Sequence, residues 1–143
     1  MKLKQLLLAL PAALVGLTPL VCAAATASVN CPAIINTTQT MVSTPQEFQV
    51  SSKHVNHYLE QITFFSGKPS ENASLVPDRN SNGKAIWTFS ADTKGYISCG
   101  YYKTYVELFK PLPANTRSCV VIYDLNAQGS VGPIPKKITC EVG

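Results

Sequence analysis

The sequence predicts an all-β fold, a small antiparallel barrel or sandwich of about seven or eight strands that is stapled by disulfides. Short segments alternate apolar and polar side chains with a period of two residues, which is the pattern of half-buried strands. The breaks between these segments are rich in Gly, Pro and Asn, the residues that favour turns. No segment has helical periodicity over about ten residues or more. These observations favour strands throughout the chain.

The start of the chain has the three-part layout of a secretory signal peptide. Lys2 and Lys4 precede a leucine-rich apolar run, and small residues follow that run. The run is short for a membrane span and contains proline and glycine, which break or kink helices. We therefore expect a signal peptide over residues 1–27, cleaved between about residues 23 and 27. Residues 28–143 are then a single β domain, periplasmic or secreted, with no membrane anchor after cleavage.

Composition excludes two broad classes of protein. Hydrophobic residues make up 45% of the 143 residues and charged residues only 14%, which is incompatible with intrinsic disorder. Without the two lysines of the predicted leader, ten basic and eight acidic side chains remain, and the basic ones are scattered. A net charge this close to zero argues against nucleic-acid binding, which needs a basic stripe.

Four cysteines follow the predicted leader: Cys31, Cys99, Cys119 and Cys140. An even number in an exported chain indicates two disulfides formed in an oxidising compartment. A zinc site is the competing interpretation, but no two of these cysteines have the short spacing of zinc ligands. Of the three connectivities, we predict Cys31–Cys140, joining the ends of the domain, and Cys99–Cys119, joining central strands.

The first half of the predicted domain contains one central strand. Residues 31–35 begin the ordered part as a short strand, and residues 36–45, rich in Thr and Ser, are either an edge strand or a loop. Residues 48–51 are predicted as a short strand, with a brief helical turn within residues 45–59 as the alternative. Residues 58–66 carry bulk on both faces, which is typical of a central strand.

In the second half, residues 78–83 give the strongest loop signal, because Asn-Gly favours positive backbone angles. Four strands are predicted from residues that share a face: Trp87 and Phe89; Ile97, Cys99 and Tyr101; Cys119, Val121 and Tyr123; and Ile138, Cys140 and Val142. In three of them the cysteine is in phase with apolar residues, so the sulfurs are expected to point into a common core.

The sequence gives little support for a catalytic function. The sequence has no nucleophile elbow, phosphate loop or dinucleotide fingerprint. His54 and His57 stand three residues apart, without an acidic residue at the spacing of a zinc protease, and are interpreted as surface or turn residues. We predict that the protein is not an enzyme and uses neither a cofactor nor a metal.

A tyrosine-rich stretch is the candidate binding surface. Ser98 and Tyr102 are out of phase with Cys99, and Lys103 and Thr104 follow where the strand can bend. Tyrosine provides a large contact area with a polar tip, which suits protein interfaces. The alternative is that the tyrosines only cover the second face of the sheet, and that Lys103 and Lys68 are ordinary solvated lysines.

The segments Cys99-Gly-Tyr-Tyr-Lys-Thr and Leu112-Pro113, followed by Cys119-Val-Val-Ile-Tyr-Asp, resemble a family of small exported proteobacterial proteins with two disulfides. At the level of architecture, that family resembles the periplasmic inhibitors of c-type lysozyme (the MliC/PliC type). Those inhibitors are disulfide-bonded β-barrels that push a loop with a serine and a lysine into the lysozyme cleft.

The resemblance implies a periplasmic binding protein whose protein partner is a c-type lysozyme. Its contact residues in this chain would be Ser98, Tyr102, Lys103 and Thr104, with Lys68 or Arg79 on nearby loops. The alternative function is a periplasmic structural or interaction domain with another partner and no inhibitory activity, such as an accessory of an envelope or secretion system.

Overall fold

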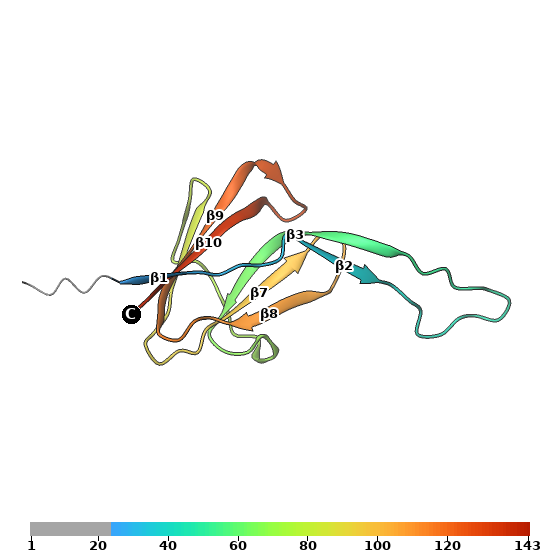
Figure 1. The fold of residues 1–143 in the computed structure, drawn as a ribbon, viewed down its shortest axis with the longest axis horizontal. Coiled ribbons are helices and arrows are strands. Elements are labelled where there is room, and N and C mark those ends of the chain that lie inside the picture. The colour runs from blue at the N-terminus through green and yellow to red at the C-terminus, as the bar shows by residue number, and fades with distance from the viewer. Residues whose placement is uncertain (1–23) are drawn as a thin grey trace, which may run out of the picture.

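The structure, a computed structural model, describes residues 24–143, so that all but the last four residues of the predicted signal peptide lie outside the described part. Two curled antiparallel sheets face each other and form a half-barrel or sandwich (Figure 1). One sheet has the order β1 (Ala25–Ser28), β10 (Pro133–Val142), β9 (Thr116–Gln128), β6 (Lys84–Thr88) and β5 (Arg79–Ser81). The other has the order β2 (Ile34–Thr38), β3 (His54–Phe65), β7 (Tyr96–Tyr101) and β8 (Glu107–Pro111), with β4 (Ser74–Leu75) beside β3.

The predicted all-β class is confirmed. The described residues form ten strands, more than the seven or eight expected, because short edge strands such as β1, β4 and β5 carry too few residues to show an alternation. The one helical element among them is the short 3-10 turn η1 (Pro69–Glu71). Within residues 24–143, no helix has the length and apolar character needed to span a membrane.

The core lies between the two sheets and is centred on Phe64 of β3, which is fully buried. Its ring centroid lies 4.8 Å from that of Trp87 and 5.9 Å from that of Phe89, both contributed by the opposite layer. Tilted aromatic pairs of this kind add about 0.5–1.5 kcal/mol beyond the burial of their surface. The Trp87 indole N–H donates to the Leu75 carbonyl at 3.2 Å, so that its polar group is satisfied inside the protein.

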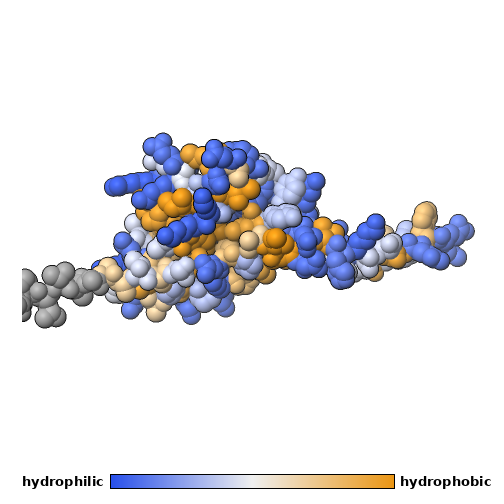
Figure 2. All heavy atoms as spheres, turned by 45° about the horizontal axis from the view of Figure 1, so that its top comes forward, coloured by the Kyte–Doolittle hydropathy of each residue, from blue (hydrophilic) through white to orange (hydrophobic). Residues whose placement is uncertain are grey.

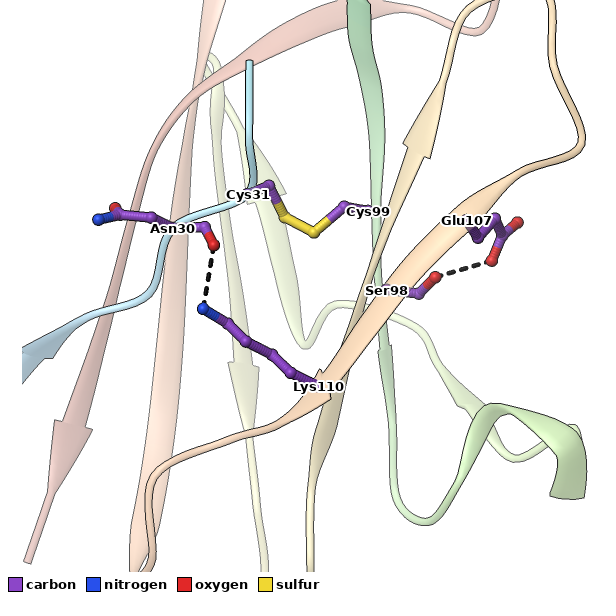
Figure 3. Close-up of a disulfide and its surroundings, with 6 residues drawn as sticks. All are labelled: Asn30, Cys31, Ser98, Cys99, Glu107 and Lys110. Atoms are coloured by element: carbon purple, nitrogen blue, oxygen red, sulfur yellow. Dashed lines mark hydrogen bonds between the residues drawn. A yellow bond between two sulfur atoms is a disulfide. The ribbon is translucent and has the colours of Figure 1, made fainter. Parts of the chain in front are cut away.

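The disulfide pairing predicted from the sequence is wrong. The structure joins Cys31 to Cys99 and Cys119 to Cys140 (Figure 3 shows the first pair). Cys119 and Cys140 lie directly opposite each other on β9 and β10, with Cα atoms 4.1 Å apart, whereas Cys99 lies in the other sheet. The expectation that three strand cysteines point into the core is confirmed, since Cys99, Cys119 and Cys140 are all buried.

The local predictions have mixed outcomes. The strand expected at residues 48–51 is absent, and residues 36–45 divide into the end of β2 and a loop. The alternative helical turn within residues 45–59 is not formed either. The turn at Asn82 and Gly83 is confirmed by their φ values of 50° and 70°, but the residues before it form β5 and not a loop.

A two-stranded arm leaves the body of the protein (Figure 1). It consists of residues 34–58, in which β2 pairs with the first half of β3 and a long loop connects the two strands. From Leu59 onward β3 joins β7 and becomes part of the body. The space-filling view shows the arm extending well beyond the rest of the surface (Figure 2).

Candidate functional site: the loop end

The β7–β8 connection, residues 102–106, brings together three of the predicted contact residues. Tyr102 and Lys103 are exposed and Thr104 is partly exposed. Lys103 has a φ of 57°, so its backbone is in the left-handed region, and its Nζ lies 4.9 Å from the centre of the Tyr102 ring. The Thr104 hydroxyl accepts a hydrogen bond from the Val106 N–H at 3.1 Å. The connection is therefore a shaped turn that presents an aromatic ring and a cation together.

The β9–β10 turn, residues 129–132, lies beside this connection and is held by Glu60 of β3. The strand register passes from Leu59 to Gln61 with a shift, which leaves Glu60 as the extra residue of a β-bulge. Its carboxylate accepts a hydrogen bond from the Ser130 backbone N–H. A Cβ atom at Gly129 would lie only 2.6 Å from Glu60 Oε1, so a larger residue there would force the Glu60 side chain to shift.

An open cleft of about 750 Å³ separates the two turns. Its lining combines the Glu60 carboxylate, the Lys103 side chain and the fully exposed Tyr105. Two neighbouring hollows of about 440 and 400 Å³ also include Glu60 in their linings. We call this part of the molecule the loop end: residues 102–106, residues 129–132 and residues 58–61.

Buried His57 connects the loop end to the root of the arm. Its Nδ1 lies 2.7 Å from the Tyr102 carbonyl oxygen and its Nε2 lies 2.9 Å from the Thr37 hydroxyl. A carbonyl only accepts, so Nδ1 carries the proton toward Tyr102. The Tyr102 N–H also donates to the Tyr58 carbonyl at 2.9 Å. The interpretation of His57 as a surface or turn residue is wrong, because this histidine is 2% exposed and lies within β3.

The other predicted contact residues lie elsewhere. Ser98 is 2% exposed and its hydroxyl donates to Glu107 at 2.7 Å, so it presents no group to a partner (Figure 3). Lys68 is exposed but precedes η1, beyond the far end of β3. Phe65, the last residue of β3, lies seven positions along the strand from Tyr58, a distance of roughly 20 Å. Arg79 is exposed on β5, in the opposite sheet.

Sequence reasoning missed Glu60 and did not foresee the unpaired hydroxyl of Tyr101. Glu60 interrupts the alternation of β3, yet only the register with β7 reveals the bulge. Tyr101 was expected on a core face, and its hydroxyl is buried without a hydrogen-bond partner among the described residues. Burial raises the pKa of the Tyr101 phenol above its ordinary value. Neither the bulge at Glu60 nor the unpaired hydroxyl of Tyr101 gives a distinctive local sequence signal.

The chemistry of the loop end suits recognition of a protein surface. Aromatic rings at Tyr58, Tyr102 and Tyr105 surround one carboxylate and one ammonium group. The two turns are fixed by hydrogen bonds to the body, which lowers the entropy lost on binding. Within residues 24–143, no three His, Cys, Asp or Glu side chains gather as a metal site would require, and all four cysteines there are in disulfides.

Comparison with known proteins gives one match. The family model described as "Type VI secretion system Tli immunity protein" matches residues 52–141, which is well over half of the chain. The match covers all of β3 and the strands from β4 to β10 except the last residue of β10, and it includes the whole loop end. No curated protein and no solved structure matches the chain, so the resemblance to lysozyme inhibitors stays a prediction.

Proposed function

The chain belongs to the family of type VI secretion system Tli immunity proteins, and from this membership we propose that it binds and neutralises a type VI toxin through its loop end. An immunity protein binds a partner toxin, which makes it a binding protein and not a catalyst. The family match carries the proposal, and the loop end is the surface to which we assign it.

Three properties of the loop end support this assignment. Its exposed Tyr102 and Tyr105 supply aromatic anchors of the kind that dominate protein interfaces. Lys103 adds an ammonium group held beside the Tyr102 ring. The cleft lined by Glu60 offers a concave feature of about 750 Å³ next to these anchors. A toxin surface with a protruding side chain and a matching acidic group fits such an arrangement.

We further propose that the protein works in the periplasm after removal of its signal peptide. Two disulfides support an oxidising compartment. The cleavage position affects the fold, because Ala25–Ser28 forms β1 and pairs with β10. Cleavage after residue 23 or 24 keeps this strand, whereas cleavage after residue 27 removes most of it. N-terminal sequencing of protein purified from the cell envelope distinguishes the two.

The proposal is tested by co-producing the protein with each type VI toxin of the same strain. We expect one toxin to be neutralised in cells and to form a complex with the purified, oxidised protein. The double substitution Tyr102→Ala and Lys103→Ala should weaken that complex by about 30-fold or more if both side chains act as anchors. Lys68→Ala is the matched control, since Lys68 is exposed about 20 Å away. Absence of a complex with any of the toxins would reject the proposed function.

A second proposal names a c-type lysozyme as the partner. Its support is Lys103, an exposed lysine on a preformed turn that can present an ammonium group to the carboxylates of a glycosidase cleft. A turbidity assay of cell-wall lysis tests it. Lysis should slow in the presence of excess protein, and Lys103→Ala should relieve the inhibition. Lysis at full rate in molar excess would reject lysozyme as the partner and leave the toxin proposal standing.

A further inference from the structure

The arm, residues 34–58, is the feature that the loop end does not account for. It projects from the body as a two-stranded ribbon with a loop at its far end (Figures 1 and 2). A projection of this length costs conformational entropy and buries little apolar surface of its own. Its exposed apolar side chains are concentrated toward the loop, at Met41, Val42, Phe48 and Val50.

The loop displays its apolar side chains through a strained turn. The Phe48 N–H donates to the Pro45 carbonyl at 3.2 Å, and Glu47 within this turn has a φ of 77°. A position with such a φ normally holds glycine or asparagine. The turn directs Phe48 into solvent with 72% of its surface exposed, and Val42 is fully exposed.

Side-chain hydrogen bonds cross the root of the arm. Across the ribbon, Asn36 donates to the Asn56 side chain at 2.8 Å, and the Thr38 hydroxyl lies 3.0 Å from Nδ1 of His54. Buried His57 then connects the ribbon to the β7–β8 connection, as described above. These contacts join the base of the ribbon to the loop end, and the loop with the apolar side chains extends from that base.

The arm carries almost no net charge. Glu47 and Lys53 are its two ionic side chains, and the remaining polar residues are Ser, Thr, Asn, Gln and His. An interface of this composition gains little from steering by opposite charge and depends on shape and apolar contact. A protruding ribbon with an apolar tip is complementary to a concave, uncharged cleft.

The range of the family match is a further observation about the arm. It begins at residue 52, so β2 and most of the connecting loop lie before the matched part, while the loop end lies inside it. Recognition of one toxin among several requires contacts that the family does not share. A segment outside the matched part that projects from the matched body is well placed to supply them.

We propose that the arm is the specificity element of this protein, and that its apolar tip inserts into a neutral, apolar-lined cleft of the toxin. This inference rests on the proposed function and refines it. The loop end then provides the contact common to the family, and the arm selects the cognate toxin.

The test measures binding of the oxidised protein to the toxin that it neutralises. Val42→Asp and Phe48→Asp should each lower the affinity by about 30-fold, because each places a charge in an apolar cleft. The matched controls are Val76→Asp and Phe109→Asp, which make the same changes at exposed apolar residues outside the arm. These should bind the toxin as the unaltered protein does. All four variants should keep the thermal midpoint, since the residues are exposed.

The outcomes separate the two proposals. Loss of binding on Tyr102→Ala with Lys103→Ala, but full affinity of both arm variants, would overturn the arm inference and keep the proposed function. Failure of the unaltered protein to bind any toxin would overturn both. The alternative is that the arm contacts a second copy of this chain, which sedimentation of the protein alone tests. A dimer that Phe48→Asp converts to a monomer would assign the arm to that contact and reject insertion into a toxin cleft.

Discussion

Removing the Cys31–Cys99 disulfide by Cys31→Ala with Cys99→Ala should lower the free energy of unfolding by about 4 kcal/mol. The bridge closes a loop of 68 residues. In the chain-entropy model, a loop of that length removes about 15 cal/mol/K of unfolded-state entropy, which is about 4 kcal/mol at 25 °C. For a domain whose whole stability is of order 5–15 kcal/mol, this is a large fraction.

Urea unfolding followed by fluorescence measures the loss. Trp87 is the single tryptophan and is 5% exposed, so its emission reports opening of the core. With a denaturant slope of about 2 kcal/mol/M, the midpoint should fall by about 2 M. Cys119→Ala with Cys140→Ala is the comparison. The bridge that it removes closes a loop of 21 residues, which predicts a smaller entropic loss of stability, about 3 kcal/mol. Removing two fully buried sulfurs also leaves a cavity, which lowers the stability further.

The same variants test the pairing itself. The single substitution Cys31→Ala should leave one free thiol, and alkylation followed by peptide mapping should locate it at Cys99. A thiol at Cys140 would restore the pairing that the sequence alone suggested. A change below about 1 kcal/mol on removing both Cys31 and Cys99 would refute the entropic argument for this bridge.

Phe64→Ala should cost about 3–5 kcal/mol in urea unfolding, because Phe64 is fully buried at the centre of the core; a loss near zero would contradict that placement. Hydrogen bonds from the Thr88 hydroxyl and backbone N–H hold the pKa of Asp78 below its ordinary value. The ionised Asp78 carboxylate therefore stabilises the fold fully above the unfolded pKa of about 3.9, and this contribution is lost as the pH falls through the folded pKa. Asp78→Asn should therefore flatten the acid side of the thermal-midpoint profile, and an unaltered profile would contradict this. Glu60→Ala should speed hydrogen exchange of the Ser130 amide, which loses its acceptor; unchanged exchange would argue against the contact.

The all-β class was predictable because burial follows the two-residue alternation. Cys119 and Cys140 were placed in phase with apolar neighbours, and both are fully buried. Their pairing was not predictable in the same way, because a disulfide depends on which strands become neighbours. Adjacent strands in sequence, β9 and β10, form a hairpin that sets the two cysteines opposite each other. The sequence pattern defines faces, whereas the partner across the sheet comes from topology.

The candidate site was predictable in part for a similar reason. The alternation of apolar and polar residues in β7 ends at Tyr101. The residues that follow, Tyr102, Lys103 and Thr104, lie on an exposed turn. Ser98 was expected on an accessible face, but it is 2% exposed and its hydroxyl is hydrogen-bonded to Glu107 of the neighbouring strand β8. Glu60 was missed because a bulge is a property of two strands in register. Local pattern therefore identified the turn and not the groups packed behind it.

The Cys31–Cys99 bridge also bears on binding, because it lies next to the arm. Cys31 precedes β2 by only a few residues. Between Cys31 and β2, the Ala33 carbonyl accepts a hydrogen bond from the Leu59 N–H at 2.9 Å. The bridge thus fixes the first strand of the arm to β7 of the body, while His57 fixes the second strand to Tyr102. Without the bridge, β2 keeps its hydrogen bonds to β3 but loses its covalent anchor.

Under conditions where Cys31→Ala with Cys99→Ala remains folded, we therefore expect faster hydrogen exchange in β2 and weaker binding of the toxin. Cys119→Ala with Cys140→Ala, whose bridge lies in the opposite sheet, should leave exchange in β2 unchanged at the same fraction folded. The comparison separates loss of arm order from loss of overall stability, since both pairs destabilise the domain. Equal affinities for the two double variants would mean that the arm needs no anchor at Cys31, and that rigidity of the arm does not contribute to recognition.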